Sequence, residues 1–344
     1  MAGARQSKAS HRREREARES RVQERVTLIS IGVLIAVAVI TVAGVVWGLV
    51  LPPRATVLTV GNESFNAEDA KSRAIFLIAG NEFPEEPVDA AVDMLTREAI
   101  LLQAGAPKVG EITADDLTKA IRERIGVAAD ASAQDYEDRV KAFLEISRID
   151  RPMLERIARA EVVADRLGAS YAEAIGSAGL QYHLMGVSGR DQNKVKELRE
   201  AVLAGADLPT KALELGLVTA KQTPDLGWSL PPVAGYLKDT VKVDALKPGQ
   251  ASEIQEQNFA YEFYFMAERD EQRAYTDAQK EQLQARKVVE WAEQQREALK
   301  VTEDVSTAER RWILTRVTKA AAEIAEERAK LNSGATSVPI QVTK

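Results

Sequence analysis

One uncharged run of 26 residues, positions 26–51, constrains this chain more than any other feature of the sequence. As a helix rising 1.5 Å per residue it would be about 39 Å long, and the hydrocarbon core of a bilayer is about 30 Å thick. A cleavable signal peptide has an apolar core of about 7–15 residues and a small-residue cleavage site, and the stretch around Trp47 offers no such site. Buried helices of soluble proteins rarely stay uncharged for so long. The run therefore predicts a retained signal-anchor transmembrane helix.

The charges on either side of this run predict its orientation. Residues 1–25 contain eight Lys or Arg and four Glu, whereas only Arg54 follows closely behind the run. Positive residues stay on the cytoplasmic side, so we expect a cytoplasmic N-terminal tail and an extracytoplasmic main part. The tail could also be interpreted as a nucleic-acid-binding arm, but its interleaved Glu residues favour a topology signal that contacts anionic lipid headgroups.

Composition excludes several classes of chemistry. The net charge is −6 and the tail contributes +4, so the remainder carries about −10, which argues against nucleic acid as a partner. The chain has no cysteine, which excludes disulfides and thiolate ligands. With only His11 and His183, a histidine-rich metal site is excluded as well, and no phosphate-binding glycine motif is present. We expect no metal and no cofactor.

The pattern behind the run predicts a mostly helical α+β protein. Residues 55–60 and those from Glu63 onward form two short strands around a Gly61-Asn62 turn. Apolar spacings of three and four residues predict helices over 67–80, 87–106, 114–126, 133–147 and 152–175. Asn66 and Thr113 are expected N-caps.

A small α+β unit is predicted to follow, and two long helices after it. Its strands are expected over 181–187 and 259–267, its helices over 191–203 and 207–215, a turn over 224–228 and one helical turn over 241–246. The closing helices cover about 275–299 and 306–331, the second with a capping box at Ser306 and Glu309. Each carries an apolar stripe that needs a partner surface, and the first helical unit is the natural one.

Several strings in this order resemble the SurA/PrsA group of parvulin-type foldases, over about residues 57–300. The hairpin string starting at Val57 (VLTVGNESF), the string starting at Glu98 (EAILLQAGA) and the string starting at Ile112 (ITADDL) resemble the N-terminal chaperone domain of that group. The strings starting at Gln181 (QYHLM), Asp225 (DLGW) and Leu246 (LKPGQAS) resemble its parvulin domain.

The charge pattern, the apolar run and the resemblance together predict six segments. They are a basic cytoplasmic tail (1–25), a transmembrane helix (26–51), a SurA-N-like helical chaperone domain (55–178), an inserted parvulin-like domain (179–270), C-terminal helices that pack on the chaperone domain (273–332) and a disordered tail (333–344).

The resemblance also implies a site, although the sequence departs from the family pattern there. His183 occupies the position of the first family histidine, but Glu262 stands where the second is expected, and the expected Cys or Asp between Leu213 and Thr223 is missing. His183 and Glu262 are the candidate catalytic pair, hydrogen-bonded across adjacent strands; the alternative is a purely structural histidine. The candidate client-binding residues are Leu226, Trp228, Tyr236, Leu237, Val241 and Tyr261.

Three functions remain open at this point. The first is a membrane-anchored bacterial foldase or chaperone that binds unfolded or newly translocated polypeptides beside the translocation machinery, with weak or absent prolyl isomerase activity. The second is an active parvulin-type peptidyl-prolyl isomerase. The third is a non-catalytic scaffold subunit of a membrane complex.

Overall fold

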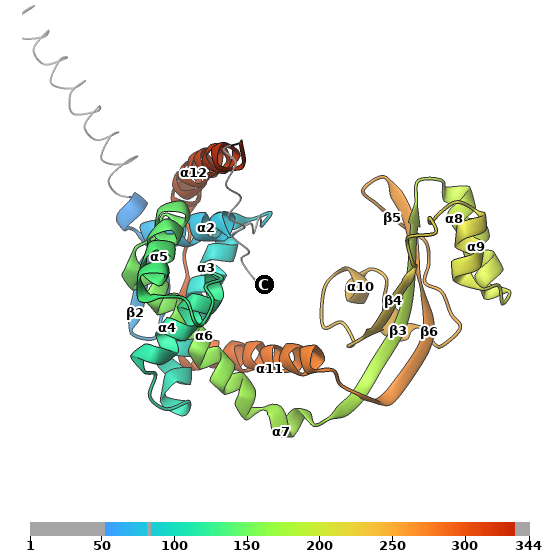
Figure 1. The fold of residues 1–344 in the computed structure, drawn as a ribbon, viewed down its shortest axis with the longest axis horizontal. Helices are drawn as coiled ribbons and strands as arrows, with labels where there is room; N and C mark the ends of the chain where they lie inside the picture. Colours follow the sequence, from blue (N-terminus) through green and yellow to red (C-terminus); the bar gives the residue numbers. More distant parts are fainter. Residues whose placement is uncertain (1–51, 81–83, 334–344) are drawn as a thin grey trace, which may run out of the picture. The chain divides into compact units, whose positions relative to one another are not determined.

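The computed structural model describes residues 52–80 and 84–333 (Figure 1). The predicted cytoplasmic tail, the transmembrane segment and the tail beyond residue 333 lie outside these residues. Within 52–80 and 84–333, no helix is both long and apolar enough to cross a bilayer. The fold is mostly helical α+β with two small sheets, which confirms the predicted fold class at that level.

The chain divides into two compact units. Unit 1 comprises residues 1–163 and 292–344, and unit 2 comprises residues 164–291. The helix α6 (Arg151–Ser170) begins in unit 1 and ends in unit 2, whereas α11 (Asp277–Ala298) begins in unit 2 and ends in unit 1. The predicted domain boundaries at 178/179 and near 270 differ from these divisions, and they stay predictions.

Unit 1 combines a three-stranded sheet with a set of helices. Its strand order is β2-β1-β7, with both pairings antiparallel. Its elements are η2 (Pro52–Arg54), β1 (Thr56–Val60), β2 (Glu63–Asn66), α2 (Ala67–Ala79), α3 (Pro87–Ile100), η3 (Leu101–Gly105), η4 (Ala106–Lys108), α4 (Ala114–Arg124), α5 (Ala133–Ser147), β7 (Thr302–Glu303) and α12 (Thr307–Ser333).

Local capping chemistry explains where several of these helices begin. At the start of α2, the Asn66 side chain accepts from the Asp69 backbone N–H, and the Asp69 side chain accepts from the Asn66 backbone N–H. Thr113 and Asp116 form the same reciprocal pair at the start of α4. Ser306 and Glu309 do so at α12. A side-chain oxygen satisfies an N–H that has no partner inside the helix, so a short sequence pattern sets the start. All three caps were predicted, and all three are confirmed.

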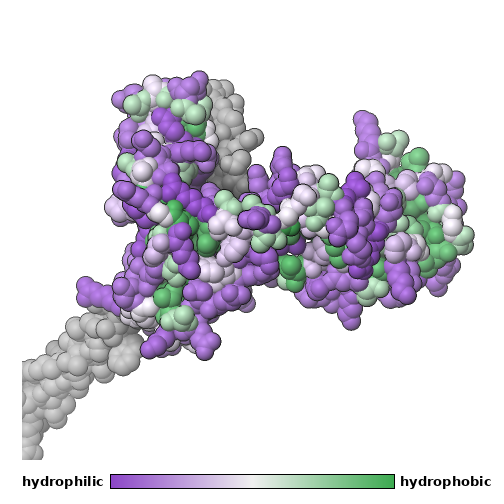
Figure 2. Space-filling model, turned by 90° about the horizontal axis from the view of Figure 1, so that it is seen from below, coloured by the Kyte–Doolittle hydropathy of each residue, from purple (hydrophilic) through white to green (hydrophobic). Residues whose placement is uncertain are grey.

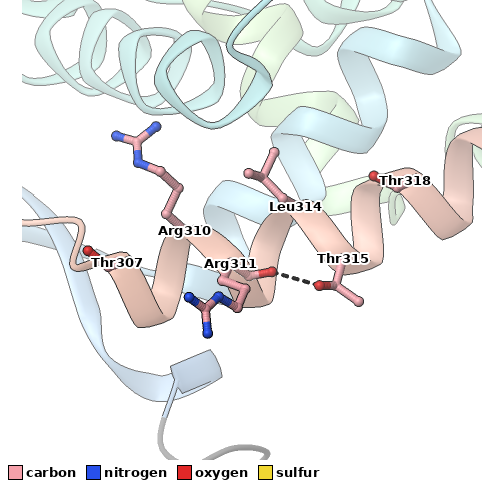
Figure 3. Close-up of a pocket in the computed structure, with 6 residues that line it drawn as sticks. All are labelled: Thr307, Arg310, Arg311, Leu314, Thr315 and Thr318. Carbon is pink, nitrogen blue, oxygen red and sulfur yellow. Dashed lines mark hydrogen bonds between the residues drawn. The ribbon is translucent and has the colours of Figure 1, made fainter.

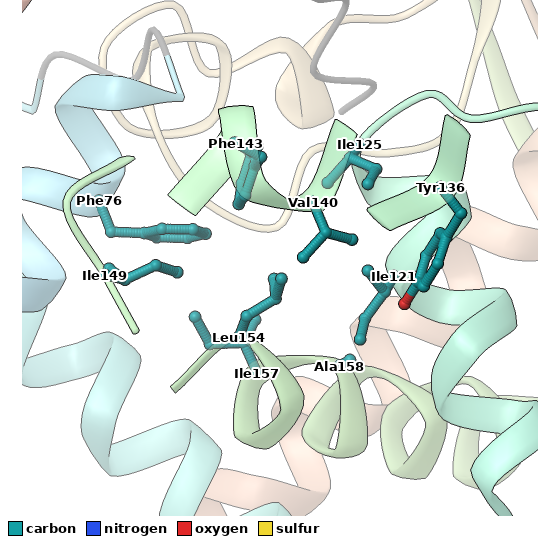
Figure 4. Packing of buried hydrophobic residues seen from close by; sticks show 10 residues of the cluster. All are labelled: Phe76, Ile121, Ile125, Tyr136, Val140, Phe143, Ile149, Leu154, Ile157 and Ala158. Carbon is teal, nitrogen blue, oxygen red and sulfur yellow. The ribbon is translucent and has the colours of Figure 1, made fainter. Parts of the chain in front are cut away.

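The core of unit 1 lies between α2, α4, α5 and the first turns of α6 (Figure 4). Figure 4 shows Phe76 and Phe143 meeting edge to face, with ring centroids 6.2 Å apart. The buried cluster consists of Phe76, Ile121, Ile125, Tyr136, Val140, Phe143, Ile149, Leu154, Ile157 and Ala158. The helix α12 packs on α2 and α3, as expected for a C-terminal helix that buries its apolar stripe on the first helical unit.

Unit 2 is built on a four-stranded antiparallel sheet with strand order β4-β3-β6-β5. Its elements are α7 (Ala172–Ile175), β3 (Ala178–Gly189), α8 (Gln192–Leu203), α9 (Leu208–Glu214), β4 (Asp225–Ser229), α10 (Tyr236–Asp239), η5 (Val243–Ala245), β5 (Gln255–Gln257) and β6 (Ala260–Ala274). The stretch 224–228 was predicted as a turn, and that prediction is wrong for residues 225–228, which belong to β4 and pair with β3 as part of an edge strand. An edge strand tolerates the bulge and the glycine that made the sequence resemble a turn.

Candidate functional site

The sheet of unit 2 has two differently covered faces. Side chains alternate along a strand, so Tyr182 and Leu184 of β3 point to one face while Met185 and Val187 point to the other. Tyr182 and Leu184 pack with Val241, Val243 and Met266 beneath the α10 segment, on what we call the α10 face. Val187 packs with Val195 and Leu198 of α8, on what we call the α8 face.

His183 lies on the α8 face, since β3 itself runs without a bulge from Tyr182 to Val187. His183 pairs with Trp228 on the neighbouring strand β4 and with Glu268 on the neighbouring strand β6. The imidazole Nε2 donates to Asp225 Oδ1 at 2.8 Å, and Nδ1 lies 3.7 Å from Glu268 Oε1. Nδ1 is buried and has no hydrogen-bond partner among the described residues. His183 is thus held between two carboxylates.

Asp225 is held in its ionised form. The backbone N–H of Gly227 donates to its Oδ1 at 2.7 Å, and His183 donates to the same oxygen. Both bonds lower the pKa of Asp225, and the bond from Gly227 has the larger effect. The carboxylate therefore fixes both the bulge of β4 before Gly227 and the orientation of the imidazole.

Trp228 completes this cluster. Its ring stacks on His183 with centroids 5.2 Å apart and planes 20° apart, and the Arg273 guanidinium carbon lies 3.9 Å from its ring centroid. Both contacts use the faces of the indole, where its negative charge density attracts cations. The predicted client-binding residue Trp228 is therefore engaged with the chain's own His183 and Arg273.

Glu262 lies elsewhere in the sheet. It pairs with Ser188 of β3 and Gln255 of β5, five residues along β3 from His183, or about 16 Å at 3.3 Å per residue. With Tyr264 and Met266 it belongs to the α10 face. The predicted His183–Glu262 contact is therefore wrong; the pairing register and the alternation of side chains separate the two.

The α10 face gathers its own polar groups. Burial raises the pKa of Tyr236 and of Tyr264, and the nearby Glu262 carboxylate raises both further by a smaller amount. The two rings meet edge to face with centroids 6.4 Å apart. The Tyr236 hydroxyl and Glu262 Oε1 are both buried, and the Glu262 carboxylate is a hydrogen-bonding neighbour of Tyr236. This face therefore brings a buried phenol and a carboxylate together.

The remaining predicted client-binding residues divide between the two faces. Tyr236 and Leu237 pack on the α10 face, and Val241 is part of its core at 6% exposure. Leu226 occupies the β4 bulge at 55% exposure beside Gly186, where a Cβ would lie 3.1 Å from the Leu226 side chain. Tyr261 packs with Phe263 on the α8 face. The structure thus brings Leu226, Tyr236 and Leu237 together with Glu262, and keeps Trp228, Tyr261 and His183 on the other side.

Sequence reasoning missed two residues of the His183 cluster. Asp225 was noted as part of a turn and of the DLGW string but was given no role beside His183, although a carboxylate in that string was a usable signal. Glu268 gave no signal, because its place opposite His183 depends on how β6 pairs with β3.

Of three comparisons with known proteins, only the comparison with solved structures finds similar proteins. No protein-family model matches the chain, and no curated protein does either. Among solved structures, the chain is similar to the peptidylprolyl isomerase PrsA of Bacillus anthracis, at 14% identity, covering 67% of this chain and 96% of that one, with a TM-score of 0.32. The foldase PrsA of Streptococcus pneumoniae matches at 11% identity over 84% of this chain and 97% of its own, also with a TM-score of 0.32.

A SurA-like chaperone of Campylobacter jejuni matches at 13% identity, over 83% of this chain and all 100% of that one, with a TM-score of 0.23. These proteins belong to the same group as the one the sequence strings resemble. Because the TM-scores and identities are this low, the function is argued below from the chain's own residues.

Proposed function

We propose that this chain is a membrane-anchored, extracytoplasmic foldase or chaperone that holds unfolded or newly translocated polypeptides, with weak or absent prolyl isomerase activity. Anchoring is supported by the uncharged run at 26–51 and the basic tail before it. No nucleotide, metal or other cofactor enters the proposal.

Exposed apolar side chains on unit 2 carry this proposal. Of seven large hydrophobic residues that are exposed within the described chain, six belong to unit 2. They are Leu203, Leu213, Leu226, Val233, Phe259 and Val289. Figure 2 shows hydrophobic residues reaching the surface of this unit between hydrophilic ones. Dispersed apolar contacts of this kind bind an unfolded chain without fixing one partner geometry, and the ordering cost keeps binding reversible.

An aggregation assay tests the holding activity. Full-length protein in lipid nanodiscs should suppress aggregation of a chemically unfolded client, and the double variant Leu226→Glu/Val233→Glu should need at least threefold more protein for the same suppression. Lys196→Glu, which changes an exposed polar residue of α8 (its side chain is 68% exposed), serves as the matched control and should leave suppression unchanged. Equal suppression by the double variant would refute the role of these side chains.

Weak or absent isomerase activity is supported by the separation of the predicted pair. A prolyl isomerase must lower a barrier of roughly 18–20 kcal/mol by binding the twisted amide, which needs polar and apolar groups on one surface. Here His183 lies on the α8 face of the sheet, whereas Glu262, Tyr236 and Leu226 lie on the α10 face. The test is cis-to-trans conversion of an Ala-Pro peptide: acceleration by the full-length protein that His183→Ala abolishes would overturn this part of the proposal.

A further inference from the structure

A stripe of α12 faces away from the core of unit 1. Residues spaced three and four apart line an open, shallow pocket along the first half of the helix (Figure 3). They are Thr307, Arg310, Arg311, Leu314, Thr315 and Thr318, and together we call them the outer stripe. The other side of the helix supplies Ile313, Val317, Ala320 and Ile324 to the core. The outer stripe therefore adds little to the apolar packing of α12, although its Arg310 joins the helix to Asp89 of α3.

The outer stripe has an amphipathic composition. Thr307, Thr315 and Thr318 present hydroxyl groups, and Leu314 is the one exposed large hydrophobic residue among the described residues of unit 1. The Arg310 guanidinium donates to both carboxylate oxygens of Asp89, at 2.8 and 2.6 Å, whereas the neighbouring Arg311 is exposed. Figure 3 shows Arg310 and Arg311 leaving the helix on different sides.

The beginning of the described chain lies beside this helix. The short element η2 contacts α12 as well as α2, and Pro52 directly follows the last residue of the uncharged run. The three residues of η2 span at most about 3.8 Å each. The part of α12 that contacts η2 therefore lies within about 20 Å of the end of that run. The run is about 9 Å longer than the hydrocarbon core, so a spanning helix would end at the level of the headgroups.

The charge near this point is suited to a lipid surface. Arg54 in η2 and Arg311 in the outer stripe are both exposed. The part of the chain beyond the anchor is acidic overall, about −10, which argues against adhesion of the whole extracytoplasmic part to anionic lipid. Asp89 and Glu86 act on Arg310, so Arg54 and Arg311 are the arginines left to face a lipid surface. Salt screens the charges that lie more than about 8–10 Å from these two side chains.

The structure points to a second membrane contact: the outer stripe of α12 rests on the lipid headgroups around the anchor, with Arg311 at the phosphates and Leu314 at the acyl boundary. This inference rests on the membrane anchoring in the proposed function. It gives α12 the role of fixing the orientation of unit 1 relative to the bilayer.

Site-specific labelling of the full-length protein tests this contact. Because the chain has no cysteine, a single environment-sensitive fluorophore can be placed at Thr315→Cys, and the control label goes at Lys119→Cys, on α4, where the native side chain is 78% exposed. In nanodiscs with about one third phosphatidylglycerol, we expect a headgroup-borne quencher to act at least twofold more strongly at 315 than at 119. Arg311→Glu should remove at least half of that difference, and Lys119→Glu should not change the signal from position 315.

The outcomes separate the contact from the anchor. Failure of the full-length protein to remain in nanodiscs would refute the anchoring itself. Retention with equal quenching at 315 and 119 would refute the contact alone.

Discussion

Arg73 and Glu98 form an ion pair that is almost completely removed from water. Their side chains are 3% and 4% exposed, and Nη2 of Arg73 donates to both carboxylate oxygens at 2.9 and 2.8 Å. Desolvation lowers the pKa of Arg73 while Glu98 opposes that shift, and Arg156 reaches the same carboxylate. Arg73 therefore depends on the Glu98 carboxylate to remain charged where water is excluded.

Removing one member of this pair should destabilise the protein strongly. We expect Glu98→Ala to cost about 3–5 kcal/mol, because it leaves Arg73 buried without its counter-charge. Urea unfolding of the full-length protein measures the change. Lys119→Ala is the control: it breaks an exposed pair with Glu123, with side chains 78% and 66% exposed, and should cost less than about 0.5 kcal/mol. Similar losses in both variants would contradict the buried role of Glu98.

Asp225 should make the His183 cluster sensitive to acid. Because the folded state lowers the pKa of Asp225, the ionised carboxylate stabilises the fold above the ordinary Asp pKa of about 3.9. That contribution is lost as the pH falls through the lowered value. The urea midpoint should therefore fall further between pH 5 and pH 2.5 in the native chain than in Asp225→Asn, with Glu197→Gln, an exposed change on α8, as control. A native-like acid response in Asp225→Asn would contradict the assignment.

At the level of elements, the β5–β6 hairpin contains a turn that its sequence does not favour. Gln257 pairs with Ala260, so the loop is Asn258-Phe259, with φ values of 51° and 63°. A two-residue loop with both φ values positive is a type I′ turn, for which Asn-Gly is preferred. Phe259 adopts this conformation with 91% of its surface exposed, so its side chain gains little packing in return.

Phe259→Gly should therefore stabilise unit 2. The left-handed conformation costs a non-glycine residue about 1–2 kcal/mol, and the extra backbone entropy of glycine offsets part of it, which leaves a gain of about 0.5–1 kcal/mol. Thermal unfolding followed by circular dichroism measures it. Gly216→Ala should change the stability in the opposite direction. The φ of Gly216 is 68°, so the added Cβ should destabilise the protein by about 1 kcal/mol even though the space around it is open. A loss of stability in Phe259→Gly would show that the aromatic ring makes a contact of its own.

At the level of the whole molecule, each unit has its own buried core. The cluster around Leu154 holds unit 1 together, and the cluster around Leu198 and Phe263 holds the α8 face of unit 2. Leu154 and Leu198 are both 0% exposed, so either Leu→Ala change should cost about 2–5 kcal/mol through lost burial and the cavity left behind.

Separate cores predict separate unfolding transitions. Calorimetry of the full-length protein should show Leu154→Ala lowering the midpoint of one transition and Leu198→Ala that of the other. A single transition that both variants shift equally would mean that α6 and α11, which continue from one unit into the other, join the cores into one cooperative structure.

Local patterns predicted most elements, because local chemistry sets their ends. The caps at Asn66, Thr113 and Ser306 satisfy helix N–H groups within three residues, and the helix predicted over 133–147 is α5. The strand β6 was predicted to end near Ala267 but continues to Ala274 through charged residues. Its extension depends on pairing with the first residues of β3, about ninety positions earlier, which no local pattern encodes.

The amino-acid sequence by itself determined the helical core, the capping positions, the absence of thiol chemistry and a 26-residue run suited to a membrane, since each depends on residues close together in the chain. Only the tertiary structure decided which side chains meet across the sheet. A strand turns alternate residues to opposite faces, so the pairing register places His183 beside Asp225 and Glu268 while Glu262, opposite Ser188, joins Tyr236 and Tyr264. A motif locates a residue along the chain, but long-range pairing selects its neighbours.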